Sequence, residues 1–168
     1  MKHGLISAVL LGWMSLASAS SPASAAGARG PSGASVQALD ERVIAHMQFH
    51  GYVAEPGGSP AVYRFVHKNH LNLSIRQRKD GFLVGSWYRA TPYLLAHRGD
   101  CLTVLNDINE QTLALRAYMD QAGDVALEAY FPGDYQQANF NEFLDTLSAD
   151  EALLFGEPIQ SRMQRCVQ

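Results

Sequence analysis

The stretch from Leu102 to Phe131 constrains the fold of this chain more than any other segment. Its first part, up to Gln111, repeats apolar residues at the spacing of an amphipathic helix. Two strand-like runs follow, Leu113 to Asp120 and Val125 to Phe131, and Gly123 lies in the turn between them. The pattern predicts one helix followed by a tight antiparallel hairpin, and it contains no recognisable catalytic motif.

The other elements lie on either side of this unit. Leu71 to Arg78 alternates strictly between apolar and polar residues, with Asn72, Ser74 and Arg76 on the polar side, as in a half-buried antiparallel strand. Residues 55–60 form a turn cluster rich in Gly and Pro. The expected elements are, in order, a helix capped by Ser35 and stopped by Gly51, strands Ala61–His67, Leu71–Arg78 and Phe82–Arg89, a helix Pro92–Gln111, strands Leu113–Asp120 and Val125–Phe131, and a helix Gln136–Phe155.

This order, α-β-β-β-α-β-β-α, predicts an α+β fold in which helices cover an antiparallel sheet. Two details stay open. Thr91-Pro92 favours a helix start, but Gly99 interrupts the helix that follows. Ser148 and Glu151 have the spacing of a capping box, which would divide the last helix in two.

The start of the chain, from Met1 to Ala25, has the layout of a secretory signal peptide. A polar start with Lys2 precedes an apolar run from Leu5 to Ala17, and small residues follow as far as Ala25. The run is shorter than the roughly twenty residues that a membrane-spanning helix needs, so a cleaved peptide is favoured over an uncleaved anchor. We expect cleavage near Ala25, a periplasmic or secreted location, and no stable membrane anchor afterwards. A second small-residue triplet, residues 17–19, leaves the cleavage position open.

Cleavage after Ala25 leaves residues 26–168, a length that suits one domain with a substantial core. We expect a flexible leader at residues 26–34, a folded domain at residues 35–158 and a C-terminal tail at residues 159–168. Loss of Lys2 leaves 12 basic against 16 acidic residues, a net charge of −4. This balance lacks the basic footprint of a nucleic-acid-binding protein.

Cys101 and Cys166 both survive processing. In an oxidising compartment an even pair favours a disulfide bond, which would join the start of the central helix to the tail. The alternative is two unpaired thiols, one buried and one in a frayed tail. Redox catalysis would prefer a C-x-x-C pair, which the sequence lacks.

The chain resembles the YbjN domain family, whose fold is that of type III secretion chaperones. The resemblance is carried by VLNDIN at Val104 to Asn109, by a D-x-x-G-D turn at Asp120 to Asp124, and by the return strand VALEAYF. Gly51-Tyr52 and the aromatic spacing of the last helix also fit. It extends over about Ser35 to Phe155.

The resemblance implies a fold more than a function, since the family has no well-established catalytic residues to transfer. Its chaperone relatives form dimers and bind extended segments of partner proteins. Those chaperones are cytoplasmic, whereas this chain is expected to be exported. A role in type III secretion is therefore not implied.

Two polar groups of residues carry structural and functional alternatives. We expect Asn106 and Asn109 to hold the hairpin against the helix through hydrogen bonds to its backbone, since buried Asn needs partners. The alternative is a polar contact to a ligand. His46 and His50 lie four residues apart, a spacing that can share a metal ion, and His67 and His70 lie near the next strands. No carboxylate spacing supports that site, so we predict no metal and no cofactor.

Trp87, Tyr88 and Tyr93 are the candidate recognition patch, because aromatic residues are enriched at the centres of interfaces. Ordinary packing on the sheet is the competing interpretation. G-x-S-x-G, H-E-x-x-H and a phosphate-binding Gly-rich loop are all absent. Acidic pairs such as Asp145 and Asp150 are expected to be solvated helix faces.

The sequence therefore predicts an exported, non-enzymatic domain of YbjN type. Its expected activity is to bind a partner protein or to form a homodimer. The alternative is a periplasmic protein that binds a small ligand, or a metal through the histidines.

Overall fold

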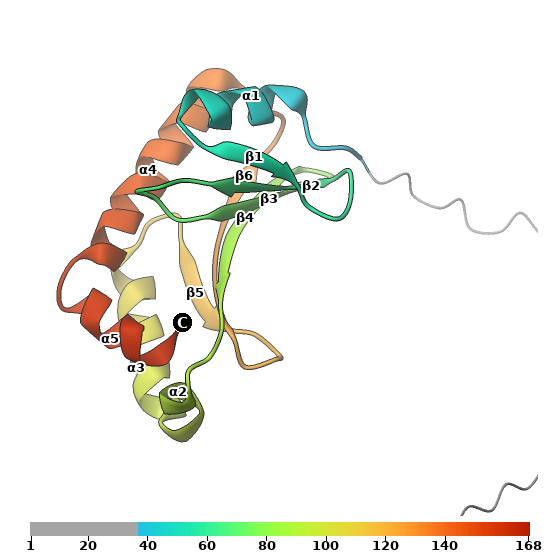
Figure 1. The fold of residues 1–168 in the computed structure, drawn as a ribbon. Helices are drawn as coiled ribbons and strands as arrows, with labels where there is room; N and C mark the ends of the chain where they lie inside the picture. The colour runs from blue at the N-terminus through green and yellow to red at the C-terminus, as the bar shows by residue number, and fades with distance from the viewer. Residues whose placement is uncertain (1–36) are drawn as a thin grey trace, which may run out of the picture. The chain divides into compact units, whose positions relative to one another are not determined.

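The computed structural model describes residues 37–168, so the expected signal peptide and leader lie outside the described residues. The helix cap expected at Ser35 is wrong, because the first helix begins at Glu41 and the Asp40 side chain caps it. The chain divides into residues 1–34 and residues 35–168, and the second unit is the one described below. Figure 1 shows its strands and helices. The strands are β1 (Val53–Pro56), β2 (Val62–Val66), β3 (Leu73–Arg78), β4 (Gly81–Tyr88), β5 (Arg116–Met119) and β6 (Val125–Pro132). The helices are α1 (Glu41–Phe49), α2 (Pro92–Ala96), α3 (Arg98–Gln111), α4 (Gln137–Phe155) and α5 (Ile159–Cys166).

These strands form one antiparallel sheet in the order β1-β2-β3-β4-β6-β5. Its centre is the long β4–β6 pair, aligned from Gly81 opposite Pro132 to Tyr88 opposite Val125. Gly81 is required at the start of β4, because a Cβ there would lie 2.1 Å from the carbonyl oxygen of Phe131. The α+β class expected from the sequence is confirmed, with the helix-hairpin unit as α3, β5 and β6.

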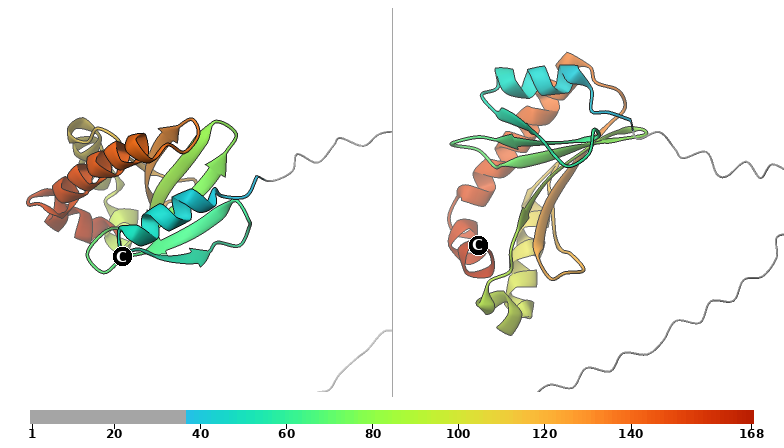
Figure 2. Two further views of the ribbon diagram at one scale, coloured as in Figure 1. Left: turned by 90° about the horizontal axis from the view of Figure 1, so that it is seen from above. Right: turned by 45° about the vertical axis from the view of Figure 1, so that its right-hand side comes forward.

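The helices gather on one side of the sheet. Figures 1 and 2 show α1 and α4 over one face, and α2, α3 and α5 grouped towards one end. Within residues 37–168 no helix covers the opposite face, which we call the outer face. Alternation along β4 separates the two sides, since Phe82 and Val84 are buried in the core whereas Trp87 is 47% exposed.

Aromatic rings dominate the core between the sheet and α4. Phe140 of α4 meets the rings of Phe82 and Phe131 edge-on, with centroids 6.2 and 5.2 Å apart. This T-shaped arrangement is one that aromatic pairs prefer. Phe65 and Met47 are fully buried in the same hydrophobic cluster and bring β2 and α1 into it.

Two acidic side chains of α4 hold neighbouring loops. Asp150 is 2% exposed and accepts hydrogen bonds from three consecutive backbone N–H groups, residues 113–115, at 2.7–2.9 Å. Glu151 accepts a hydrogen bond from the backbone N–H of Leu71. The prediction that Asp150 lies on a solvated helix face is therefore wrong, because its buried carboxylate accepts hydrogen bonds from these backbone N–H groups. The alternative break at Ser148 does not occur, because α4 is continuous.

Two local elements differ from the expectation. Residues 55–60 were expected to be a turn cluster, but the first two of them belong to β1, which is too short to show a periodic pattern. The helix expected from Pro92 to Gln111 is broken at His97 rather than at Gly99. Its start agrees with the expectation, since the Thr91 side chain caps α2.

The expected C-terminal tail at residues 159–168 is instead part of the packed domain. It forms α5, in which Ile159 and Met163 are buried. Cys166 at the end of α5 forms a disulfide bond with Cys101 in the first turn of α3, across a separation of 65 residues. The apolar positions of α5 form a single stripe in eight residues, which is too short to predict a docked helix from sequence.

Candidate functional site

The three aromatic residues of the expected recognition patch lie in different places. Trp87 is exposed on the outer face, whereas Tyr88 is half-buried and follows it on the opposite side of β4. Tyr93 is on α2, where the guanidinium of Arg165 lies 4.2 Å from the ring centroid. Its hydroxyl donates a hydrogen bond to Asp100 at 3.1 Å. The structure therefore does not bring the three together, and Trp87 is the exposed one.

The two asparagines of the central helix have different surroundings. Asn109 donates its amide N–H to the carbonyl oxygen of Ala117 at 2.9 Å, and its side-chain oxygen accepts the N–H of Ala117 at 2.7 Å. Ala117 lies on β5, which is the edge strand of the sheet. Asn109 therefore occupies the backbone groups that another strand would use at this edge. Asn106 is exposed to solvent.

The histidines form two pairs of neighbouring rings, of which only the first is stacked, rather than a ligand shell. His46 and His50 have ring centroids 4.9 Å apart, and His67 and His70 have centroids 4.5 Å apart. Among residues 37–168 no group of three or more His, Cys, Asp or Glu side chains could hold a metal ion. His46 is buried with its Nδ1 2.8 Å from the Tyr135 hydroxyl oxygen. Burial, followed by the nearby His50, lowers the pKa of His46 below its usual value of 6.5.

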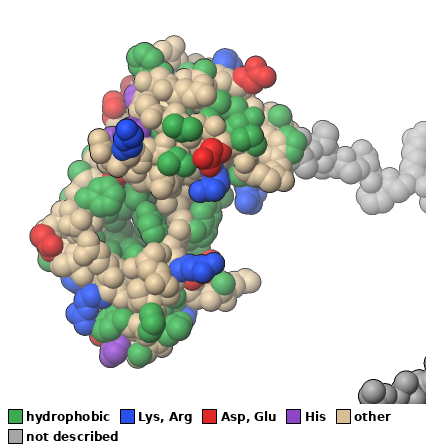
Figure 3. Space-filling model, in the orientation of Figure 1, with side chains coloured by type: hydrophobic (Ala, Val, Ile, Leu, Met, Phe, Trp, Pro, Cys, Tyr) green, Lys and Arg blue, Asp and Glu red, His purple; other side chains and the backbone are tan. Residues whose placement is uncertain are grey.

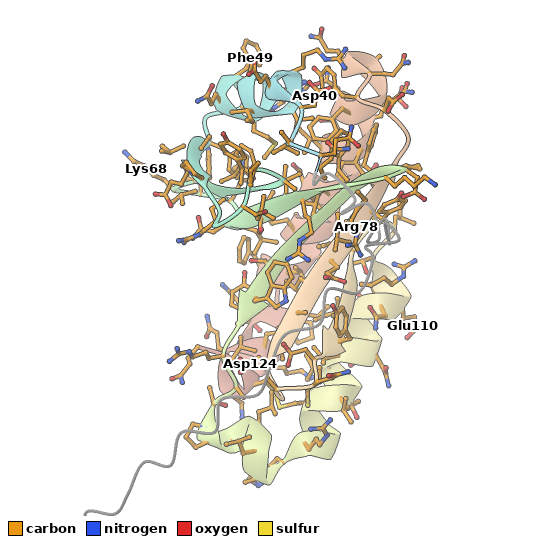
Figure 4. The ribbon with its side chains drawn as sticks, turned by 90° about the vertical axis from the view of Figure 1, so that its right-hand side faces the viewer. Asp40, Phe49, Lys68, Arg78, Glu110 and Asp124 are labelled. Atoms are coloured by element: carbon orange, nitrogen blue, oxygen red, sulfur yellow. A yellow bond between two sulfur atoms is a disulfide. The ribbon has the colours of Figure 1, made fainter. Side chains whose placement is uncertain are left out.

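A row of side chains crosses the outer face from one edge of the sheet to the other. Strand register places its members opposite one another in the order Glu55, Arg64, Ser74, Gly85, Glu128, Arg116. Ser74 and Gly85 in the middle of the row are small, whereas Arg64 and Glu128 on either side are long. The surface is therefore lower at Ser74 and Gly85, which we call the floor of the row. The outer face is seen from its helix-free side in Figure 4, with α4 behind the strands.

Gly85 has a steric reason to be Gly. A Cβ at this position would lie 2.8 Å from Cη2 of Trp87 and 3.1 Å from the carbonyl oxygen of Leu127. The indole ring of Trp87 therefore lies close over the backbone of β4 instead of projecting into solvent. A flat, half-exposed aromatic surface therefore covers the Gly85 part of the floor and lies beside Ser74.

The low floor belongs to a groove of about 580 Å³, which we call the sheet groove. Its charged lining residues are Arg64 and Arg76, and no acidic side chain lines it among the residues that the structure describes. Arg64 lies 3.8 Å from Glu55, but both side chains are largely exposed, so this pair contributes little binding energy. Arg76 forms no salt bridge within the described part of the chain. The groove therefore offers guanidinium groups, the Ser74 hydroxyl and an indole surface.

A second concavity lies on the helix side. It has a volume of about 250 Å³ and opens between the end of α4, α5 and the core side of the sheet. Figure 3 shows a hollow with hydrophobic walls in this region. We call it the apolar hollow, and its lining residues are Leu71, Tyr88, Leu127, Leu154, Phe155, Gln160, Met163, Gln164, Val167 and Gln168. None of these side chains carries a charge.

The sequence pointed to some of these residues but not to their assembly. Alternation along Leu71 to Arg78 placed Ser74 and Arg76 on the polar side of their strand, which agrees with the structure. Arg64 was missed, because its strand was recognised without an assignment of its faces. The floor formed by Ser74 and Gly85 depends on the register between β3 and β4, for which the sequence contained no signal.

None of the helices in residues 37–168 combines the length and apolar character needed to span a bilayer.

Comparison with known proteins identifies the fold. No protein-family model matches the sequence, and no curated protein matches it. The crystal structure of YbjN from E. coli, a protein provisionally assigned as a transcription regulator, superposes with a TM-score of 0.58 at 9% identity. The match covers 76% of this chain and 94% of that one. The YbjN-like fold expected from the sequence is therefore confirmed.

A weaker match is found to a chain of the heterodimeric ExoU–SpcU complex from the type III secretion system of Pseudomonas aeruginosa. It has a TM-score of 0.46 at 20% identity and covers 66% of this chain and 92% of that one.

Proposed function

We propose that this protein is an exported, non-enzymatic domain that holds a partner protein against the outer face of its sheet. The observation that carries the proposal is the sheet groove, an open concavity of about 580 Å³ beside the 47% exposed Trp87. Trp and Arg are the residue types most enriched among the side chains that dominate interface energetics. The groove combines both types.

The edges of the sheet favour binding through side chains rather than through strand addition. At β5, Asn109 already occupies the N–H and carbonyl groups of Ala117. At the other edge, β1 has four residues and ends in Pro56, which cannot donate a hydrogen bond to an added strand. Both edges are therefore poor templates for an extra strand. The outer face remains the larger accessible surface of the sheet.

The proposed export is supported by the bond between Cys101 and Cys166, because disulfides persist in oxidising compartments. It agrees with the signal-peptide layout of the segment from Met1 to Ala25. Fractionation of the native host, with N-terminal sequencing of the mature protein, tests export directly. Recovery of the uncleaved chain in the cytosol with reduced thiols would refute it.

Site-specific photocrosslinking in the native host tests partner binding. Trp87→p-benzoylphenylalanine places the crosslinker on the outer face. Phe49→p-benzoylphenylalanine is the matched control, because Phe49 is 88% exposed and projects from α1 away from the sheet, as Figure 4 shows. We expect a discrete crosslinked protein from position 87 and none of the same mass from position 49.

The mass of the adduct also identifies self-association. An adduct of twice the mass of the mature chain, together with a dimer in light scattering, assigns the outer face to a homodimer. If position 87 yields no adduct while the variant folds normally, the proposed use of the outer face is wrong.

The apolar hollow favours a second candidate function, the binding of a small uncharged apolar ligand. Its volume of about 250 Å³ exceeds the roughly 150 Å³ of an engineered apolar cavity that binds benzene. The uncharged side chains of the lining, which include three glutamines, suit a ligand that has an apolar body and a neutral polar end. The candidate metal site has no such support, since no suitable ligand group occurs in residues 37–168.

Fluorescence of N-phenyl-1-naphthylamine tests this second function. Gln164→Trp adds bulk at the exposed rim of the hollow, and Gln48→Trp on exposed α1 is the control. Saturable dye binding that Gln164→Trp abolishes and Gln48→Trp leaves intact supports a ligand site. Dye binding unaffected by Gln164→Trp excludes the hollow as that site.

A further inference from the structure

We infer that the sheet groove selects an acidic segment of its partner, with a carboxylate held by Arg64 and Arg76 and a neighbouring apolar side chain placed on Trp87. This inference rests on the proposed function and specifies the partner's chemistry. Its basis is the distribution of charge around the groove, the small floor between the arginines, and the position of the indole ring.

The two arginines belong to neighbouring strands and flank the floor. Arg64 of β2 lies opposite Ser74 of β3, and Arg76 lies two residues further along the same strand as Ser74. Side chains two apart on a strand project from the same face, so Ser74 and Arg76 both face the groove. A carboxylate above Ser74 therefore has a hydroxyl donor below it and a guanidinium group on two sides. Guanidinium groups match the planar geometry of a carboxylate and form strong charge-assisted hydrogen bonds with it.

The charge of the groove is opposite to that of the whole protein. The 168 residues have a net charge of −3, and the proposed cleavage after Ala25 would make the protein more acidic by removing Lys2. The groove nevertheless contains two arginines and no acidic lining residue within the described part of the chain. Because Arg76 has no salt-bridge partner among these residues, its charge is available to a ligand. Complementary charge of this kind steers association and suppresses wrong partners.

Trp87 adds an apolar requirement next to the charged one. Its indole lies over Gly85, and Gly85 lies directly opposite Ser74. An acidic residue above Ser74 therefore brings its neighbour in the bound segment close to the indole surface. Burial of that surface contributes about 25 cal/mol for each Å² removed from water. The favoured partner segment thus has at least one Asp or Glu adjacent to a large apolar residue.

A peptide fits these features better than a nucleic acid. Nucleic-acid-binding domains are usually basic and place Lys and Arg along an extended patch. Here two arginines surround a floor of small residues on a protein with a negative net charge. A single-stranded oligonucleotide is therefore a competing probe in the test.

Selection from a phage-displayed library of random peptides tests the inference with the mature, oxidised protein. Arg64→Glu and Arg76→Glu reverse the charge of the groove. Arg98→Glu is the matched control, since Arg98 is exposed at the start of α3 and does not line the groove. Trp87→Ala removes the indole. Circular dichroism and thiol counting verify that each variant is folded and disulfide-bonded.

The expected result is enrichment of peptides with Asp or Glu next to an aromatic or aliphatic residue. Each groove charge reversal is expected to weaken the selected peptide by about tenfold or more, with stronger binding at low salt. Arg98→Glu is expected to leave the affinity unchanged within about twofold, and an oligonucleotide of the same length is expected to bind more weakly than the peptide.

Other outcomes separate the inference from the proposed function. Peptides that require Trp87 but show no acidic preference overturn the inference and leave the outer face as a binding surface. Tighter binding of the oligonucleotide overturns the acidic-peptide specificity. Failure to enrich any peptide also overturns the inference, while crosslinking from position 87 decides the proposed function independently.

Discussion

Reduction of the bond between Cys101 and Cys166 is expected to remove a large part of the stability of this protein. The bond spans 65 residues, and in the chain-entropy model a loop of this length contributes about 4 kcal/mol at 25 °C. Domains are typically stable by about 5–15 kcal/mol, so the reduced protein is expected to retain a free energy of unfolding of about 1–11 kcal/mol. The local effect is expected to be largest at α5, which the bond holds against α3.

Urea unfolding of the mature protein, with and without a phosphine reductant, measures this contribution. With a denaturant slope of about 2 kcal/mol per M, a loss of 4 kcal/mol lowers the midpoint by about 2 M. Trp87 is the single tryptophan of residues 26–168, the chain expected after cleavage at Ala25, so its fluorescence reports on the sheet. Circular dichroism follows the helices in parallel.

The control is the double variant Cys101→Ala with Cys166→Ala, whose midpoint is expected to be insensitive to reductant. Reduced wild-type protein is the better measure of the bond, because both buried sulfur atoms remain in place. A midpoint that changes by less than about 0.5 M on reduction would show that the loop-closure reasoning fails here. Two free thiols in unreduced protein from the native host would show that the bond does not form there.

Three further predictions concern polar groups. Asp150→Ala removes the acceptor of three backbone N–H groups and is expected to destabilise the domain by about 3–5 kcal/mol in urea unfolding, whereas Asp150→Asn keeps one acceptor oxygen and is expected to lose less. Asn109→Ala is expected to cost about 1–2 kcal/mol and to promote association through the exposed edge of β5, measured by light scattering, whereas exposed Asn106→Ala is expected to change neither property. Burial lowers the pKa of His46 in the folded protein below its usual value of 6.5. As the pH falls below 6.5, His46 is therefore protonated in the unfolded chain before it is protonated in the folded protein. The free energy of unfolding is expected to decrease in that pH range. His46→Gln is expected to flatten this part of the dependence of the urea midpoint on pH, and an unchanged slope would contradict the assignment.

The order of the elements could be predicted because it depends on local patterns. Alternation along Leu71 to Arg78 and the helical spacing before the hairpin are properties of a few adjacent residues, and both agree with the structure. The Thr91-Pro92 helix start is local in the same sense. Elements with few residues gave no such signal, which is why β1 and α5 were not expected.

The environment of a polar side chain could not be predicted in this way. Asp150 has the sequence context of a solvated helix face, yet α4 brings it against the unpaired backbone of residues 113–115. The surroundings of Asn109 also depend on the tertiary structure, because its hydrogen-bond partner Ala117 lies on the edge strand of the sheet. In both cases the tertiary position of backbone donors and acceptors decides whether the side chain is buried.

The sheet groove shows most clearly which features follow from local sequence patterns and which depend on the tertiary structure. The sequence was sufficient to place Ser74 and Arg76 on one side of their strand, because alternation has a period of two along any strand. It contained no information that Arg64 and Gly85 lie on either side of Ser74, which depends on the register of three strands. A slip of one residue in either pairing would turn the opposing side chains to the core side of the sheet. The groove therefore exists because the buried core, and not the groove residues themselves, sets that register.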